Sequence, residues 1–261
     1  MTCFGQNIGK SEKTTQIKVQ QIKINSETLY AFTSGFAQSQ TIKELYLIHC
    51  FITSDVLEKG LIENISQNKS LILLDLSFNL LNGQAGGLIG KLLSSHSKNR
   101  DDRIWLCGLR GEVPENDVNL EGICELNLMG NALNYKSVKD LCYFLQFDGW
   151  TRSLNLRYNQ IDAEGLLEID KMLDNNENLI SLDIRNNPGI TPNTDELEKF
   201  GESLKVISKR IFDKLIRNIK LFKEKRENNK FQEVQEEQNE EDEGDEEEEQ
   251  KLVCYITKYI K

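Results

Sequence analysis

The sequence lacks most features of enzymes that use metals and of membrane proteins. Its 261 residues include only two histidines and three prolines, and its six cysteines form no C-x-x-C pair. Neither histidine lies at ligand spacing from a cysteine, so no zinc site is expected. No apolar run approaches the roughly 18–20 residues that span a bilayer, and the N-terminus lacks the apolar core of a signal peptide. These absences predict a cytoplasmic protein with reduced thiols and no transmembrane segment.

The sequence also lacks a recognisable catalytic motif. His49 and His96 have no nucleophile motif beside them, and we interpret both as surface residues, with His96 in a polar loop. The stretch GQAGGLIG at 83–90 has neither the Gly-Lys-Ser/Thr ending nor the G-x-G-x-x-G order of a phosphate-binding loop. Its small residues are expected to let a helix start close to its strand. The sequence therefore predicts a protein that is not an enzyme and has no cofactor or metal ion.

Charge is unevenly distributed along the chain. The net charge is −10, but twelve acids and no basic residue lie between 233 and 249, and without those acids the net charge would be +2. Residues 205–230 hold ten Lys or Arg against three acids. This order predicts a basic helix followed by a disordered acidic tail.

The sequence contains an internal repeat. Five segments fit L-x-x-L-x-L-x-x-N/C-x-L, the leucine-rich-repeat signature. They begin at Ile42, Leu71, Ile123, Thr151 and Leu179. Their starts are 29, 52, 28 and 28 residues apart, and a poorer copy begins at Thr14. Units of this length leave room for a helix after each strand.

The asparagine position of the repeat has a structural interpretation. Asn79, Asn131, Asn159 and Asn187 occupy it, and Cys50 replaces asparagine in the first segment. These amides can satisfy backbone groups that the turn after each strand leaves unpaired. We expect all five residues to stabilise the stack of repeats.

The repeat predicts an α/β fold, namely a ribonuclease-inhibitor-like leucine-rich-repeat horseshoe. In this solenoid, parallel strands line the concave face and helices cover the convex face. The predicted parts are a flexible N-terminus at 1–13, the solenoid at 14–193, a basic amphipathic helix at 194–230, and a disordered acidic tail with a short terminal segment at 231–261. Whether the helix caps the last repeat, binds a partner helix or lies on an anionic surface stays open.

The 52-residue spacing interrupts the repeat. One unit uses about 28 of these residues, and the surplus predicts a loop inserted at about 98–120. Trp105 and Leu109 would anchor this loop against the solenoid, and Pro114 would shape its turns. The alternative is a degenerate repeat whose helix has collapsed into a loop.

This interruption resembles that of the centrosomal protein 78 family. The residues that carry the resemblance here are Trp105, Leu109, Arg110, Pro114, Gly122 and Ile123. The family's closing repeat is matched by Leu182, Asp183, Ile184, Arg185, Asn187 and Pro188. The resemblance covers roughly 42–191. It departs from the family in one extra residue between Pro114 and Gly122, a shorter N-terminal region and no long C-terminal coiled coil.

The resemblance implies a non-enzymatic scaffold of the centriole, basal body or ciliary axoneme, with roles in cilium formation and control of a ubiquitin ligase. Tubulin or ciliary structural proteins would then be partners. Partners that use the missing C-terminal region cannot be carried over to this chain.

The repeat pattern indicates where a protein partner would bind. Alternate positions of each strand face the concave surface, which should be apolar at one end and basic at the other. These predicted binding residues are Tyr46, Ile48, Leu73, Asp75, Asn127, Met129, Asn155, Arg157, Asp183 and Arg185. The inserted loop would add Trp105 and Arg110. A partner helix or loop fits this surface, no specific nucleic acid is expected, and the oligomeric state is not predicted.

Two alternative functions belong to other classes. Repeats followed by an acidic tail are also typical of a GTPase-activating protein for the small nuclear-transport GTPase, although that family stacks more repeats. Acidic nuclear proteins that bind histones have similar tails but shorter repeats.

Overall fold

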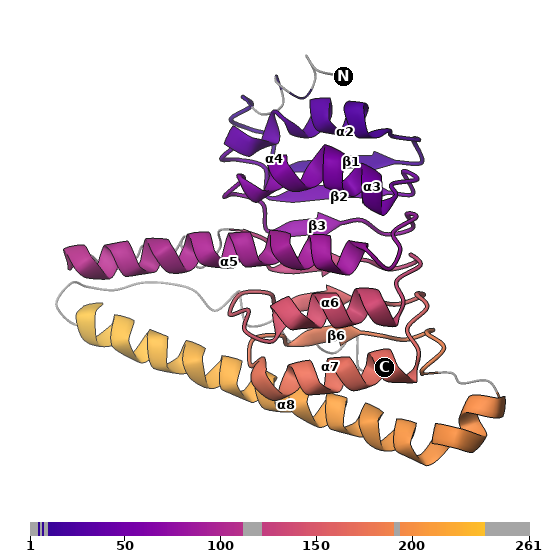
Figure 1. Ribbon diagram of the computed structural model, residues 1–261. Helices are drawn as coiled ribbons and strands as arrows, with labels where there is room; N and C mark the ends of the chain where they lie inside the picture. Colours follow the sequence, from indigo (N-terminus) through magenta and orange to yellow (C-terminus); the bar gives the residue numbers. More distant parts are fainter. Residues whose placement is uncertain (1–4, 6, 8–9, 112–121, 191–193, 238–261) are drawn as a thin grey trace.

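The chain forms one parallel sheet of six strands. The computed structural model describes residues 5, 7, 10–111, 122–190 and 194–237, with the backbone alone for 38, 194–203 and 228–237. The strands are β1 (Gln16–Gln20), β2 (Glu44–Ile48), β3 (Leu73–Asp75), β4 (Glu125–Asn127), β5 (Ser153–Asn155) and β6 (Ser181–Asp183). They pair in chain order from β1 to β6, so each repeat of the sequence adds one strand (Figure 1).

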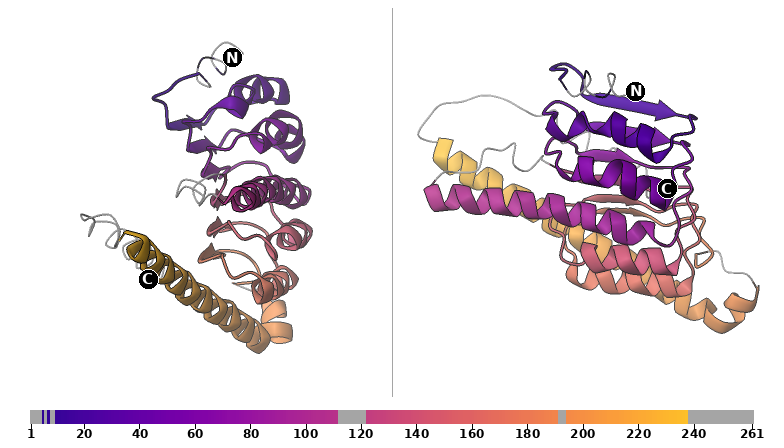
Figure 2. Two further views of the ribbon diagram at one scale, coloured as in Figure 1. Left: turned by 90° about the vertical axis from the view of Figure 1, so that its left-hand side faces the viewer. Right: turned by 45° about the horizontal axis from the view of Figure 1, so that its top comes forward.

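Helices follow the strands, and all but the last of them pack on one face of the sheet, whereas the last crosses the end of the stack (Figure 2). They are α2 (Ser26–Thr33), the 3₁₀ turn η1 (Phe36–Gln38), α3 (Ser54–Leu57), the π-helical η2 (Glu58–Ile62), α4 (Glu63–Ser66), α5 (Ala85–Arg110), α6 (Tyr135–Leu145), α7 (Ala163–Asn175) and α8 (Thr194–Glu237). The segment α3-η2-α4 runs without a break in the chain. None of the helices in the described ranges has the length and apolar content needed to span a bilayer.

Buried and half-buried side chains alternate along the strands, so one face of the sheet belongs to the core and the opposite face does not. Leu45 and Leu47 of β2 are fully buried, whereas Glu44, Tyr46 and Ile48 are half-buried. The register places equivalent leucines beside one another in successive strands. This row is Leu45, Leu74, Leu126, Leu154 and Leu182. Each buried leucine contributes about 1.5–3 kcal/mol, so the row forms the core between sheet and helices.

The repeat asparagines join neighbouring units, as the sequence predicts. The Asn79 side chain donates to the Leu47 carbonyl at 2.7 Å and accepts from the Cys50 amide at 2.9 Å, both in the preceding unit. It also donates to the Leu76 carbonyl of its own unit at 2.9 Å. Asn131, Asn159 and Asn187 make equivalent contacts. Their structural role is confirmed.

The predicted horseshoe is wrong. The described residues form a short α/β stack with one six-stranded parallel sheet and helices on one face. Curvature in stacked repeats accumulates from a small rotation in each unit. Here the units are few, β3 to β6 have three residues each, and α8 packs against the end of the stack. The expected ribonuclease-inhibitor-like solenoid therefore does not develop.

The predicted inserted loop is wrong for residues 98–110, because these residues continue α5. The helix ends at Gly111, which adopts a left-handed φ of +67° that glycine tolerates best. Trp105 and Leu109 are 65% and 64% exposed, so neither is packed into the core that the described residues form. The rest of the predicted loop, including Pro114, lies outside the described residues.

Two further predictions about residues of α5 are wrong. A β-carbon on Gly86 would lie 1.8 Å from the Ser137 carbonyl oxygen, and one on Gly90 would lie 2.2 Å from the Phe144 ring. The small residues therefore let α5 approach α6, rather than its own strand. His96 was predicted to lie in a polar loop but is 2% exposed in the interior of α5.

Helix α8 closes the stack and continues beyond it (Figure 2). Leu204, Ile207 and Ile211 are buried. Asp170 of α7, itself 5% exposed, forms ion pairs with Arg210 at 2.5 Å and Lys214 at 2.8 Å. The basic helix is thus docked on α7. It extends to Glu237, into the predicted tail, and residues 238–261 lie outside the described ranges.

Candidate protein-binding surface

The face of the sheet opposite the helices, here called the open face, carries three rows of side chains. The first row follows the strand starts: Gln16, Glu44, Leu73, Glu125, Ser153 and Ser181. The second row is Lys18, Tyr46, Asp75, Asn127, Asn155 and Asp183. The third row lies two residues further along each unit and includes Ile48, Ser77, Met129, Arg157 and Arg185.

The second row is held by local hydrogen bonds. Asp75, Asn127, Asn155 and Asp183 each accept a bond from the backbone amide two residues ahead, over 2.8–3.1 Å. Such Asx turns fix the chain where it leaves the strand. The Asn127 amide also donates to the Asp75 carboxylate at 2.8 Å. These four residues therefore shape the surface in addition to lining it.

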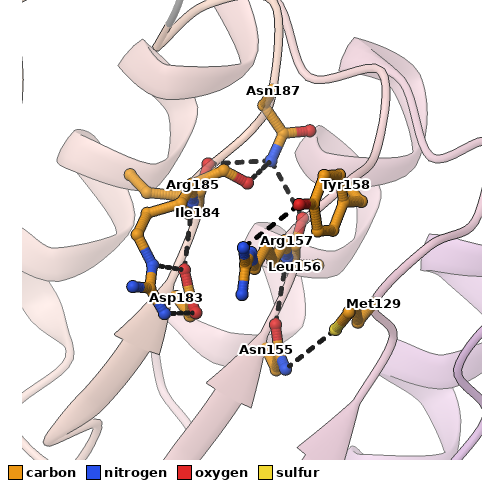
Figure 3. Close-up of polar contacts among 9 residues, drawn as sticks. All are labelled: Met129, Asn155, Leu156, Arg157, Tyr158, Asp183, Ile184, Arg185 and Asn187. Carbon is orange, nitrogen blue, oxygen red and sulfur yellow. Dashed lines mark hydrogen bonds and ion pairs between the residues drawn. The ribbon is translucent and has the colours of Figure 1, made fainter. Parts of the chain in front are cut away.

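The β5–β6 end of the open face has a connected polar cluster (Figure 3). Arg185 binds the Asp183 carboxylate through two nitrogens, at 2.9 and 2.5 Å. Arg157 donates to the Tyr158 hydroxyl at 3.1 Å, and its guanidinium lies 4.6 Å from that ring. With the Asn186 amide turned so that both of its ends find partners, its side-chain oxygen accepts from Arg157 at 3.1 Å and from the Tyr158 hydroxyl at 2.9 Å. Both arginines are therefore positioned before any partner binds.

The opposite half of the open face carries acids as well as apolar groups. The Glu44 carboxylate accepts from Gln16 at 2.6 Å and from the Tyr46 hydroxyl at 2.9 Å. Burial, followed by the hydrogen bond and charge of Glu44, raises the pKa of Tyr46 to about 12. Burial and then the Glu44 charge raise the pKa of Glu125. The predicted apolar end is therefore both apolar and acidic.

At the β5–β6 end, the positive charge is partly neutralised within the polar cluster. Burial acts to raise the pKa of Asp183, but hydrogen bonds and charge from Arg185 outweigh it and lower that pKa. The ionised carboxylate thus balances Arg185. The basic end that the sequence predicted depends mainly on Arg157, whose side chain is half-buried.

Exposed apolar side chains line the edge where the strands end. Phe51, Phe78, Leu80 and Tyr158 are 43–53% exposed. The backbones of Phe51, Phe78 and Tyr158 have left-handed φ values of +55° to +58°. Such values cost a non-glycine residue about 1–3 kcal/mol and persist only where the surrounding structure fixes them. We call these four residues the apolar rim.

The residue before each repeat asparagine, and before Cys50 in the unit where cysteine replaces it, has this left-handed backbone. These residues are His49, Phe78, Gly130, Tyr158 and Asn186. A β-carbon on Gly130 would lie 2.5 Å from the Phe78 ring. The ring therefore fills the space that a side chain on the next unit would need. Comparing the five repeats at this position would have identified Phe78 and Tyr158, which the sequence prediction missed.

The structure brings ten of the twelve predicted binding residues onto or beside the open face. All ten belong to the second and third rows or to Leu73 of the first row. Apart from Asp75, which is buried, and Arg185, which is exposed, they are half-buried. Trp105 and Arg110 do not join them, because both lie on the part of α5 that runs past the sheet (Figure 1).

The side chains of the open face suit protein binding more readily than catalysis. Within the described ranges, no group of three or more His, Cys, Asp or Glu side chains is placed to hold a metal ion. The open face is mixed, with half-buried apolar groups beside oriented polar ones. Protein interfaces combine apolar, aromatic and arginine side chains in this way.

Two curated proteins are similar in sequence to part of the chain. The centrosomal protein of 78 kDa from Mus musculus is 26% identical over 166 residues, which are 63% of this chain and 21% of that protein. The protein of the same name from Homo sapiens is 27% identical over 170 residues, 63% of this chain and 24% of that protein. The chain thus spans less than a quarter of the length of either relative. No protein-family model matches it.

The fold can be compared with those of solved structures. The leiomodin-1 actin-binding site 2 superposes with a TM-score of 0.50 and 15% identity, covering 88% of this chain and 94% of that one. The tropomodulin C-terminal domain from Caenorhabditis elegans gives a TM-score of 0.45 and 15% identity, covering 86% and 96%. The leiomodin-1 likeness shows a shared fold and overturns the ribonuclease-inhibitor-like horseshoe expected from the repeats.

Proposed function

We propose that this chain is a non-enzymatic scaffold of the centrosome that binds a protein partner through its open face. Support for the location comes from the two centrosomal proteins that the chain resembles over 63% of its length. A centriolar or basal-body position within the centrosome is the finer part of this proposal.

The observation that carries the binding proposal is the order of the open face. Asx turns and the cluster of Arg157, Tyr158 and Asn186 fix polar groups beside half-buried Tyr46 and Met129. Side chains that are fixed in advance lose little entropy on binding. Tyrosine and arginine are also the residues that most often dominate interface energies.

The shape of the surface favours an extended or helical segment of a partner. The open face is six strands wide, and four of these strands have only three residues. It also lies beside the apolar rim, which can receive apolar side chains from the same segment. Activation of a GTPase and binding of histones are not favoured, since the curated relatives are centrosomal proteins.

The test is localisation of the tagged full-length chain beside a centriole marker. The wild type should concentrate at the centrosome, and Tyr46→Ala/Met129→Ala should become diffuse while it still unfolds cooperatively above the growth temperature of the cells. Tyr143→Ala is the matched control, because Tyr143 is 68% exposed on α6, behind the sheet. A diffuse or nuclear wild type would contradict the location. A double variant that stays at the centrosome would contradict the role of the open face.

Binding assays can separate candidate partners. Cosedimentation of the purified chain with microtubules and with actin filaments tests the two main cytoskeletal polymers. The tubulin hypothesis predicts cosedimentation with microtubules that Tyr46→Ala/Met129→Ala weakens. Cosedimentation with actin filaments alone would replace tubulin by actin as the partner.

A further inference from the structure

A cavity of about 280 Å³ lies between α5 and the turn that precedes β3. It is on the edge of the sheet where strands begin, so it is separate from the apolar rim. Its charged and polar lining includes Lys69, His96, Asn99, Arg100, Asp102 and Arg103. Three of these side chains are cationic and one is acidic.

Arg100 is the unusual residue of this cavity. It is 2% exposed, and its guanidinium lies 4.9 Å from the Trp150 ring. One terminal nitrogen donates to the Cys124 sulfur at 3.4 Å. Its Nε and Nη1 have no hydrogen-bond partner among the described residues. A buried charged donor without a partner is costly, so an acceptor at this place would be strongly stabilising.

The neighbours of Arg100 hold it in place without accepting hydrogen bonds from its Nε and Nη1. The Nδ1 atom of His96 accepts from the Ile123 amide at 3.2 Å, which leaves the Nε2 proton to donate to the Ile65 carbonyl at 2.9 Å. Both ring nitrogens are therefore in use. A β-carbon on Gly122 would lie 2.8 Å from His96 Nδ1 and 2.9 Å from Arg100 Nη2. Glycine lets the chain close over this pair.

Burial keeps His96 uncharged at neutral pH, because it lowers the pKa of the imidazole to about 4. The positive charge available to the cavity therefore comes from Arg100 and Lys69, because Arg103 already has a contact of its own. Asp102 is the acid in the lining, and the Asp148 carboxylate also acts on Arg100 and favours its charged form. A guanidinium presents its donors in a planar fork that matches the oxygens of phosphate and carboxylate groups.

We propose that this cavity binds a single oxyanion group, of which phosphate is the best match. The group would accept from Arg100 and be balanced by Lys69, with Asn99 as a further donor. The cavity has room for a phosphate group, either free or on a phosphorylated side chain. This site is independent of the proposed function of the open face.

The first experiment titrates the full-length protein with inorganic phosphate at constant ionic strength and follows backbone amides by NMR. The amide resonances of Gly122, Ile123 and Cys124 should shift and saturate. Lys69→Ala should weaken the affinity by about tenfold, which is typical of one charged hydrogen bond. Lys91→Ala should not change it, because Lys91 is exposed on α5 outside the cavity.

Further arms identify the source of the group. O-phosphoserine binding at least as tightly as phosphate would indicate a phosphorylated side chain, and weaker binding would indicate the free ion. Arg100→Lys keeps the charge but loses the fork, so it should bind more weakly if the protein still folds. Shifts that do not saturate, or equal affinities for Lys69→Ala and Lys91→Ala, would overturn the proposal without affecting the open face.

Discussion

Asn218 of α8 donates to the carbonyl oxygen of Asn176 at 2.9 Å, and in doing so it copies what Asn176 does one unit earlier. Asn176 donates to the carbonyls of Leu145 and Asp148 in the preceding unit. Asn218 likewise reaches Asn176 and Leu179, the latter also at 2.9 Å. Helix α8 therefore donates hydrogen bonds to the backbone carbonyls at the end of the stack, as a further repeat would.

The first prediction concerns this contact. Asn218→Ala should lower the free energy of unfolding by about 1–3 kcal/mol, because it removes the side-chain donor to the Leu179 carbonyl and one of two donors to the Asn176 carbonyl, which also accepts from Arg217 at 3.1 Å. Thermal melting measures this as a fall of about 2–4 °C per kcal/mol for a chain of this size. Lys220→Ala, at an exposed position of the same helix, is the control. Equal effects of the two variants would show that Asn218 does not cap the stack.

The second prediction concerns the close approach of α5 and α6. Gly86→Ala should lower the free energy of unfolding by more than about 3 kcal/mol, because its β-carbon would overlap the Ser137 backbone and force α5 and α6 apart. Gly108→Ala, in the same helix, is the control, because its β-carbon would have no neighbour within 4 Å. This variant should raise the free energy of unfolding by about 0.5–1 kcal/mol through helix propensity. Denaturant unfolding of both variants measures the contrast, which would disappear if the two helices packed loosely.

The third prediction is a dependence of stability on pH. The pKa of His96 is about 4 in the folded protein, below the ordinary value of 6.5, because the imidazole is buried. The unfolded chain therefore binds a proton first as the pH falls. Stability should decline between about pH 6.5 and 4, by about 3 kcal/mol in total.

The measurement is the free energy of unfolding at several pH values in that window. His96→Gln should show a smaller decline than the wild type. His49→Gln, which replaces the exposed second imidazole, should keep the wild-type decline. If His96→Gln kept the full decline, another group would be responsible.

The fourth prediction concerns the end of α5. Trp105→Ala should change the free energy of unfolding by less than about 0.5 kcal/mol, because the side chain is 65% exposed. Leu92→Ala in the same helix should cost about 2–5 kcal/mol, since Leu92 is 1% exposed. Comparable losses in the two variants would show that Trp105 is packed against the body after all.

The sequence predicted those features that the repeat encodes locally. The spacing of leucines located the strands, and the asparagines were correctly interpreted as turn residues. The position of ten predicted binding residues on the open face followed from the alternation of a strand, which needs no knowledge of distant contacts.

Features that depend on distant contacts were missed. The polar sequence around His96 indicated a loop, but the imidazole is buried by Ile65 and Ile123, which lie about 30 residues away on either side. The 52-residue spacing suggested an inserted loop at about 98–120, whereas the chain remains helical as far as Arg110. The capping role of Asn218 could not be predicted, because it lies outside the repeat pattern.

The contact between Phe78 and Gly130 has a consequence for related sequences. The ring of one unit occupies the place that a side chain of the next unit would take. A lineage that replaces Gly130 by a larger residue must therefore also shrink or redirect residue 78. The two positions should covary across homologues, although 52 residues separate them in the chain.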